Sequence, residues 1–384
     1  MKKIIIKSSR VSNKKNKVQA VARTKKKKDS LLKPERKKRT IKSNKSNFSI
    51  FNKYIENPII SPKEDNSWEA WQVFNPGVIF LKNKIHFIYR AIGEDGISRL
   101  GHAASSDGFM IDERSAYPIY NYRAVKTAFS YYSFASGGSF GGCEDPRLTR
   151  VGKEDEFFMT YTACGDGLRV ALTSIKIKDF LQKKWQWKLP VLISVPGEVH
   201  KNWVIFPEKI NGKYAILHSI SPQISITYRD SLEFKPGEYI QSYYNGKNQN
   251  KNGWEKWVRG VGAPPLKTNK GWLLFYHAMD DDLSKYKLGA MLLDLKDPTK
   301  ILHRSLEPVL EPDQDYENNG FKAGVIYVSG AMIKDDKLLV YYGASDSYIG
   351  VAYANIEEFL NKLTSTKQVS LKLTKSKVKN LRKK

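Results

Sequence analysis

Hydrophobic and polar residues recur along the chain in one repeated order. A short apolar run is followed by a polar turn and then by a longer run rich in aromatic and β-branched residues. The order occurs five times, with paired runs at 75–80 and 85–91, 145–148 and 157–163, 206–210 and 214–218, 263–266 and 272–278, and 330–333 and 338–344. Each pair is typical of a β-hairpin.

A further strand candidate follows each hairpin, at 100–105, 168–177, 224–228, 288–295 and 349–354. The repeats begin about every 55 to 70 residues, which is in or a little above the range for the sheets of a β-propeller. The pattern predicts an all-β protein, a five-bladed β-propeller with disordered basic N- and C-terminal tails; a chance likeness among hairpins is the alternative. The residues that open the repeats would then line one channel: Asn75, Asp145, Glu208, Ala263 and Gly330.

The net charge of +26 is concentrated at the two ends of the chain. Residues 1–50 contain 19 Lys and Arg against two acids, residues 367–384 contain eight and no acid, and the part between them has a net charge of +1. We predict a basic tail at 1–47, a catalytic β-propeller at 48–362 and a second basic tail at 363–384. Such tails are either solvated or bind an anionic polymer, such as RNA or a membrane surface, without sequence specificity.

Several other classes of protein are disfavoured. The apolar run 4–6 is too short for a signal peptide, and no run approaches the roughly 18 apolar residues of a membrane span. Two cysteines, Cys143 and Cys164, cannot form a disulfide framework, and the six histidines lack the spacing of a zinc site. We predict a cytoplasmic protein without a metal or a bound cofactor; its oligomeric state stays open.

The densest ionisable group is Glu144-Asp145-Pro146-Arg147, which opens the second repeat. A carboxylate in a narrow channel lined by aromatic side chains would have a raised pKa and could deliver a proton near neutral pH. Asp145 or Glu144 could take this role. Alternatively, the stretch is a turn in which the acids cap backbone N–H groups and Arg147 pairs with one of them.

Later repeats carry cationic and hydrogen-bonding residues at similar places: Lys201, Asn202, Arg259, His277 and Tyr286. If they face one channel, they would form an anion site, because a phosphate needs several donors and compensating positive charge. Asp346 closes the fifth repeat and could hold sugar hydroxyls. Tryptophans in the connecting segments could stack on sugars, although packing explains any one of them as well: Trp68, Trp71, Trp203, Trp254 and Trp257.

Several of these motifs resemble the β-mannoside phosphorylases and mannosidases of glycoside hydrolase family 130. The resemblance covers about residues 55–360 in order. The matching motifs are Asn75-Pro76, Tyr89-Arg90-Ala91, Glu144-Asp145-Pro146-Arg147, Phe206-Pro207-Glu208-Lys209, Gly262-Ala263-Pro264-Pro265, the run 271–277, Leu288-Gly289-Ala290, the run 307–312 and the run 341–346.

The resemblance implies a five-bladed propeller in which inorganic phosphate, as co-substrate, attacks a β-mannoside with inversion and yields α-mannose 1-phosphate. It implies that Asp145 is the catalytic acid and passes its proton through a sugar hydroxyl. Asn75, Arg90 and Asp346 match the mannosyl pocket, and we expect Glu144 and Arg147 to hold Asp145 within it. The implied phosphate ligands are Lys201, Asn202, Arg259, His277 and Tyr286.

Ser219 departs from the family pattern, because an arginine is expected there. Loss of that donor would weaken phosphate binding and favours an alternative, an inverting β-mannosidase. Such a hydrolase needs a carboxylate base about 6.5–9.5 Å from the acid, and Glu208 is the nearest candidate by position. A third interpretation is a catalytically silent sugar-binding propeller. We favour phosphorolysis because the other cations are present.

Overall fold

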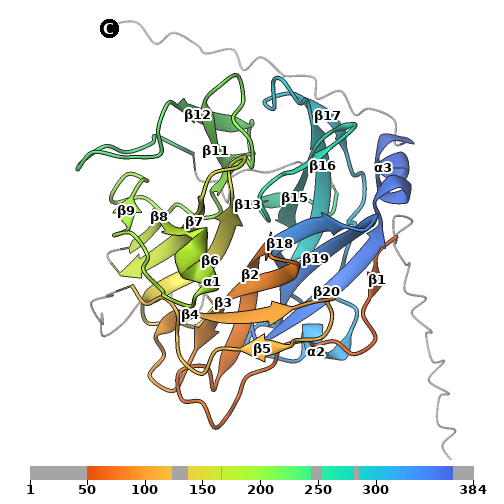
Figure 1. Ribbon diagram of the computed structural model, residues 1–384. Helices are drawn as coiled ribbons and strands as arrows, with labels where there is room; N and C mark the ends of the chain where they lie inside the picture. The colour runs from red at the N-terminus through yellow and green to blue at the C-terminus, as the bar shows by residue number, and fades with distance from the viewer. Residues whose placement is uncertain (1–49, 123–136, 166, 244–252, 281–284, 366–384) are drawn as a thin grey trace, which may run out of the picture. The chain divides into compact units, whose positions relative to one another are not determined.

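The computed structural model describes residues 50–122, 137–165, 167–243, 253–280 and 285–365 (Figure 1). The predicted tail at 1–47 lies outside these residues, as do the last 19 residues of the chain. Residues 363–365, assigned to the C-terminal tail, form the end of helix α3 (Ile356–Ser365), where Leu363 is buried. No helix in the described part of the chain is long and apolar enough to cross a bilayer.

Strands make up most of the regular secondary structure of the described residues, and they fall into five strand groups. Group 1 contains β2 (Gln72–Leu81), β3 (Lys84–Ile92), β4 (Ser98–Ser105) and β5 (Glu113–Arg114). Group 2 contains β6 (Gly142–Thr149), β7 (Glu156–Gly165), β8 (Gly167–Lys176) and β9 (Val191–Leu192). A single parallel pair, Ser98 with Gly142, joins these two groups into one eight-stranded sheet.

The other three groups are separate sheets. Group 3 contains β10 (Val204–Ile205), β11 (Tyr214–Ser219) and β12 (Ser225–Arg229). Group 4 contains β13 (Trp257–Val261), β14 (Leu266–Thr268), β15 (Gly271–Met279), β16 (Lys287–Leu293) and β17 (Ile301–Arg304). Group 5 contains β18 (Ile326–Lys334), β19 (Lys337–Ala344), β20 (Tyr348–Asn355) and the early strand β1 (Asn52–Lys53), which pairs with β20. The remaining helices are α1 (Ile177–Leu181) and α2 (Asp315–Asn318).

Of the hydrophobic cores in the described residues, five lie between successive groups and close a cycle, and a smaller sixth also lies between groups 4 and 5. The five join groups 1 and 2, 2 and 3, 3 and 4, 4 and 5, and finally 5 and 1. Alternation along one strand explains this arrangement: on β15, Trp272 and Leu274 face group 3, whereas Leu273 and Phe275 face group 5. Because both faces of the central strands are buried, these strands are apolar throughout, and this explains the long apolar runs in the sequence.

The first strands of neighbouring groups approach very closely. A Cβ atom on Gly77 would lie 2.5 Å from the Pro146 carbonyl oxygen, and one on Gly330 would lie 2.6 Å from that of Pro76. The Ser329 hydroxyl also donates to Pro76 O at 3.3 Å, so β18 and β2 lie side by side near the centre of Figure 1. The approach brings residues distant in sequence to one place.

A left-handed backbone residue marks the start of four groups, at Asn75, Asp145, Asn202 and Gly260, with φ of 48°, 51°, 67° and 130°. In groups 1, 2 and 4 it coincides with a register shift against the next strand. Asn and Asp tolerate this conformation better than other side chains. Glu208 and Ala263, which open their repeats in the sequence, do not hold these left-handed positions, because the inner strands of groups 3 and 4 start earlier in the sequence.

Three tyrosines at the same place in their strands hold the neighbouring residues in register. Tyr89, Tyr276 and Tyr342 each lie opposite a glycine on the next strand, and each hydroxyl donates to a buried or partly buried glutamate. The residues that follow two of them in sequence are Arg90 and His277. These two side chains are thus mounted on strands that are fixed by packing and hydrogen bonds.

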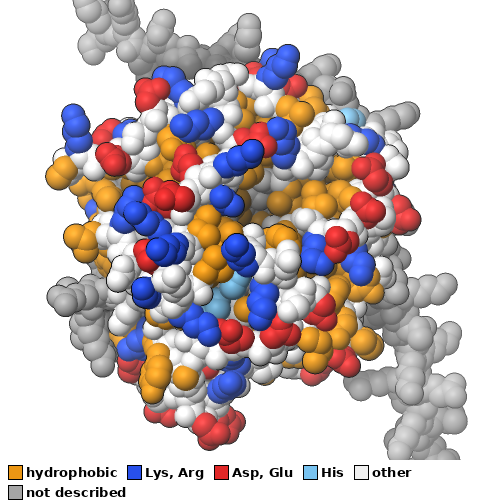
Figure 2. Space-filling view, viewed as in Figure 1, with side chains coloured by type: hydrophobic (Ala, Val, Ile, Leu, Met, Phe, Trp, Pro, Cys, Tyr) orange, Lys and Arg blue, Asp and Glu red, His pale blue; other side chains and the backbone are white. Residues whose placement is uncertain are grey.

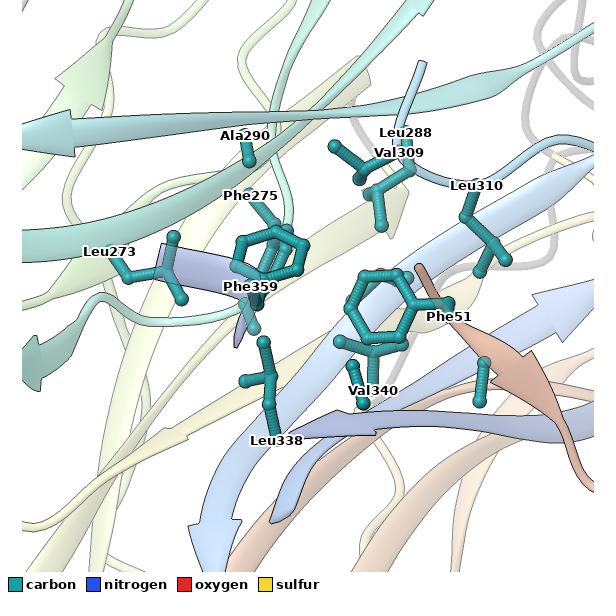
Figure 3. Close-up of a cluster of buried hydrophobic side chains, with 14 of the residues drawn as sticks. Phe51, Leu273, Phe275, Leu288, Ala290, Val309, Leu310, Leu338, Val340 and Phe359 are labelled. Carbon is teal, nitrogen blue, oxygen red and sulfur yellow. The ribbon is translucent and has the colours of Figure 1, made fainter. Parts of the chain in front are cut away.

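Helix α3 closes the core between groups 4 and 5. Figure 3 shows Phe359 beside Phe51 and Phe275, and the ring centroids lie 5.2 Å and 6.0 Å from that of Phe359. Phe51 belongs to the first described residues, so the two ends of the described chain meet in this core.

Replacement of the fully buried Phe359 by alanine is expected to lower the free energy of unfolding by about 3–5 kcal/mol, since it leaves a cavity between these rings. Chemical denaturation measures the change. The exposed neighbour Glu358→Ala is the control, with an expected change within about 0.5 kcal/mol. Equal stability of the two variants would mean that α3 is not part of the core.

Basic and acidic side chains are interspersed on the face shown in Figure 2. This agrees with the net charge of +1 between the two tails.

Candidate active site

Asp145 lies at the register shift of β6 and is 2% exposed. Its Oδ1 atom accepts a hydrogen bond from Asn75 Nδ2 at 2.8 Å and another from Arg90 Nη1 at 3.4 Å. Asn75 has the equivalent left-handed place in group 1, and Arg90 lies on β3. Three residues that were predicted to share a pocket are therefore in direct contact.

The charge state of Asp145 differs from the prediction. Burial disfavours its ionised form, but the positive charges of Arg90, Lys201 and Arg147 and the hydrogen bond from Asn75 outweigh burial. The pKa of Asp145 is lowered. The expected raised pKa is wrong because the cations that surround this carboxylate outweigh the effect of its burial.

Glu144 is fully buried and holds two cations in the site. Its carboxylate accepts hydrogen bonds from Arg90 Nη2 at 3.0 Å, Ser139 Oγ at 2.9 Å and Lys201 Nζ at 3.2 Å. Arg90 is further held by Ser98 Oγ and by the ring of Phe74. Glu144 therefore orients groups around Asp145, as expected for a holding residue.

Arg147 is buried and lies among groups 2, 3, 4 and 5. Its guanidinium donates to the main-chain oxygens of Gly262, Asp145 and Val261, to Asn202 Oδ1 and to the hydroxyl of Tyr327. Within the described residues, all of these hydrogen bonds end on neutral oxygens. The predicted alternative, an ion pair between Arg147 and Glu144 or Asp145 in a simple turn, is wrong.

The five predicted phosphate ligands are connected to this centre. Lys201 contacts Glu144, and Asn202 Nδ2 donates to the main-chain oxygen of Arg259 at 3.2 Å. Arg259 Nε in turn donates to the hydroxyl of Tyr286 at 3.1 Å. The structure thus brings together the predicted phosphate ligands Lys201, Asn202, Arg259 and Tyr286, which the sequence separates by up to 85 positions.

His277 is fully buried, and its Nε2 atom accepts a hydrogen bond from the N–H of Val328 at 2.9 Å. A backbone N–H can only donate, so the proton of the neutral imidazole lies on Nδ1. That atom has no hydrogen-bond partner among the described residues. Burial and the charge of Arg147 lower the pKa of His277 to about 3, which keeps the ring neutral.

Asp346 lies in the turn between β19 and β20 and is 7% exposed. Its main-chain oxygen accepts a hydrogen bond from Gln72 Nε2 at 2.6 Å. Burial raises the pKa of its carboxyl despite the opposing charges of Lys322 and Arg90. Asp346 thus lies near enough to Arg90 to interact with it electrostatically, as the predicted mannosyl pocket requires.

Other predicted residues do not reach this site. Glu208 forms an ion pair with Lys267 at 2.5 Å and its side chain is 45% exposed, so its prediction as the hydrolytic base is wrong. Trp68 and Trp203 are buried in hydrophobic cores and do not offer stacking faces. Ser219 lies at the end of β11, where its hydroxyl donates to the main-chain oxygen of Ser221.

Tyr327, Ser139 and Lys322 contact site residues but were not predicted. Tyr327 packs against His277, Ser139 donates to Glu144, and Lys322 lies over the ring of Tyr286 at 4.8 Å. None belongs to a repeated motif. The only sequence signal for Tyr327 was its place beside the apolar residues that begin β18. Any aromatic residue of the core gives the same signal.

Comparison with known proteins decides the family. The sequence profile of glycoside hydrolase family 130, described as beta-1,4-mannooligosaccharide phosphorylase, matches residues 36–365. The chain belongs to glycoside hydrolase family 130. The resemblance seen in the sequence is therefore confirmed.

The chain is similar to several named phosphorylases. It is 38% identical over 320 residues to a 1,2-beta-oligomannan phosphorylase of Thermoanaerobacter sp. (strain X514), covering 79% of this chain and 96% of the relative. It is 35% identical to a beta-1,2-mannobiose phosphorylase of the same organism, with 78% and 96% covered. The structure of a Listeria innocua beta-1,2-mannobiose phosphorylase matches with a TM-score of 0.63 and 26% identity, over 82% of this chain and 99% of that chain.

Proposed function

We propose that this family 130 protein is an inverting phosphorylase that cleaves a β-mannoside with inorganic phosphate to give α-mannose 1-phosphate. The two Thermoanaerobacter relatives are named for phosphorolysis of β-1,2-linked mannose. We infer the same linkage for this chain, in preference to the β-1,4 linkage in the family description. This choice rests on the 38% and 35% identity to those relatives.

The observation that carries the proposal is the buried guanidinium of Arg147. A guanidinium that is 2% exposed and hydrogen-bonded to neutral oxygens retains a full positive charge in a poorly solvated place. His277 adds a buried N–H donor without a partner in the described residues. Both features are costly by themselves and become favourable once an oxyanion is bound. Phosphate supplies the charge and the acceptor oxygens.

Asn75, Arg90 and Asp346 are proposed to hold the mannosyl unit beside Asp145. Lys201, Asn202, Arg259, His277 and Tyr286 are proposed to hold phosphate together with the positive charge of Arg147. A phosphate oxygen attacks the anomeric carbon as the bond to the glycosidic oxygen breaks. The leaving oxygen receives a proton from Asp145 through a sugar hydroxyl, and overall the proton of hydrogen phosphate ends on the released sugar.

Bound phosphate also offers a way to protonate Asp145. The lowered pKa of this carboxyl comes from surrounding cations. A phosphate dianion among those cations would cancel part of their field and favour the protonated acid. We infer that phosphate both supplies the nucleophile and prepares the proton donor.

We further propose that the five strand groups form the blades of a propeller within residues 48–362. The cyclic order of the five cores supports this arrangement. A cytoplasmic location and nonspecific binding of the basic tails to an anionic polymer stay predictions from the sequence.

Phosphate dependence of turnover tests the function. Incubation with β-1,2-mannobiose and phosphate is expected to yield α-mannose 1-phosphate, detected by phosphorus NMR, and mannose in equal amounts. Without phosphate, mannose release is expected to fall at least tenfold, because the nucleophile is absent. A β-1,4-mannobiose control tests the linkage.

Ser219 supports the hydrolase as a second candidate, since one expected phosphate donor is missing. Mannose release at the same rate with and without phosphate, and no sugar phosphate, would establish hydrolysis instead.

A further inference from the structure

Tyr327 is the second residue of β18 and connects several parts of the site. Its side chain is nearly buried, and its hydroxyl accepts a hydrogen bond from Arg147 Nη2 at 3.1 Å. The same hydroxyl donates to Asn202 Oδ1. Because a phenol has one proton, these two roles use its donor and one of its acceptor positions. The hydroxyl is therefore held in one orientation.

This hydroxyl and Arg147 together determine the orientation of the Asn202 amide. Asn202 Oδ1 accepts from both Tyr327 and Arg147 Nη2, the second at 2.9 Å. An amide nitrogen could accept neither hydrogen bond, so the oxygen must face these donors. The Nδ2 group consequently faces the other way, where one hydrogen is donated to Arg259 O at 3.2 Å. The N–H donors of Asn202 thus point away from Arg147.

The ring of Tyr327 lies flat on the imidazole of His277. The ring centroids are 4.1 Å apart and the planes differ by 13°. Stacking limits the tilt of the imidazole, while the Val328 N–H on Nε2 limits its rotation. The N–H of His277 Nδ1 is consequently aimed in a fixed direction, as a donor to a ligand oxygen must be.

We infer that Tyr327 is a positioning residue for the phosphate site. Through its hydroxyl it orients the donors of Arg147 and Asn202, and through its ring it orients the donor of His277. This inference rests on the proposed function and adds to it, because Tyr327 acts through three other side chains. Its ligand class is a tetrahedral oxyanion with the charge of phosphate.

The variant Tyr327→Phe tests the role of the hydroxyl. It keeps the ring on His277 but removes the hydroxyl that accepts from Arg147 and donates to Asn202, while the direct hydrogen bond from Arg147 to Asn202 stays. We expect KM for phosphate to rise about tenfold, as for the loss of one hydrogen bond to a charged group. KM for β-1,2-mannobiose should stay within about twofold of the wild-type value, because Asn75, Arg90 and Asp346 do not touch Tyr327 through any hydrogen bond of the described residues.

Tyr341→Phe is the matched control. Tyr341 is fully buried, and its hydroxyl has no hydrogen-bond partner among the described residues. It lies on β19 against Phe87, in the core between groups 5 and 1. Its replacement should leave both KM values unchanged. A second variant, Tyr327→Leu, also removes the ring and should raise KM for phosphate beyond the value for Tyr327→Phe.

The outcomes separate this inference from the proposed function. If wild-type protein shows no phosphate-dependent turnover, the proposed function fails. Anion binding by the wild type and by Tyr327→Phe is then compared through the rise in Tm that phosphate causes. An unchanged KM for phosphate, or an unchanged shift, would overturn the role of Tyr327. A parallel rise of both KM values, or loss of mannobiose binding by Tyr327→Phe, would also overturn it, because either result indicates a general structural role.

Discussion

Replacement of Asp145 by asparagine is expected to lower kcat by about 10³-fold or more while mannobiose binding is retained. Asparagine has nearly the same shape and tolerates the left-handed backbone of this position. It cannot donate an acidic proton, and general acid catalysis contributes roughly 10²–10⁴ to rate. Calorimetric titration with β-1,2-mannobiose and a steady-state assay with phosphate measure the two quantities.

The exposed Asp155 in the turn after β6 offers a matched control, since Asp155→Asn makes the same chemical change outside the site. It should leave kcat unchanged. Turnover by Asp145→Asn near the wild-type rate would assign the proton to another group. If wild-type protein binds mannobiose but turns over no mannoside, the sugar-binding interpretation is correct.

Asp145 also predicts how stability depends on pH. Its folded-state pKa is lowered by the surrounding cations, so it contributes stability above its unfolded pKa of about 3.9, and that contribution is lost as pH falls through the lower folded value. Below pH 4, the free energy of unfolding of wild-type protein should fall more steeply than that of Asp145→Asn. Denaturant unfolding between pH 2 and 6 measures both curves. Parallel curves would mean that Asp145 has an ordinary pKa.

The sequence was sufficient for the parts of the fold that depend on local patterns. The hairpins and their order follow from apolar alternation and polar turns, and Asp145 could be singled out because it opens a repeat. The inner positions of groups 3 and 4 differ from the expectation, because Glu208 and Ala263 open the repeats in the sequence but follow the inner strands β10 and β13. The backbone instead turns left-handed earlier, at Asn202 and Gly260.

The electrostatics of the site could not be predicted in the same way. The pKa of Asp145 depends on charges from Arg90, Arg147 and Lys201, which belong to different groups. Tyr327 gains its role only because group 5 is adjacent to Arg147 and His277. Both properties depend on how the five strand groups pack around the site. No short motif in the sequence predicts that packing.

Loss of Arg147 is expected to abolish the stabilisation that phosphate gives to the folded protein. At a phosphate concentration 100 times Kd, wild-type protein should gain about 2.7 kcal/mol in free energy of unfolding. Arg147→Met should gain less than about 0.5 kcal/mol under the same conditions, because its binding cation is gone. Denaturant unfolding with phosphate, and with chloride at the same ionic strength, measures the difference.

Without phosphate, two effects of Arg147→Met oppose each other. Removal of a buried charge whose hydrogen bonds all end on neutral oxygens is favourable, but the main-chain oxygens of Gly262 and Asp145 lose this donor and the Asp145 carboxylate loses a nearby positive charge. Each buried acceptor left unsatisfied costs about 1–3 kcal/mol, so we expect a net loss of about 2–4 kcal/mol. The control variant Arg150→Met, at an exposed position, should change neither the stability without phosphate nor the stabilisation by phosphate. Full phosphate stabilisation of Arg147→Met would exclude Arg147 as the charge that attracts the anion, and the phosphate site would then have to depend on Lys201 and Arg259.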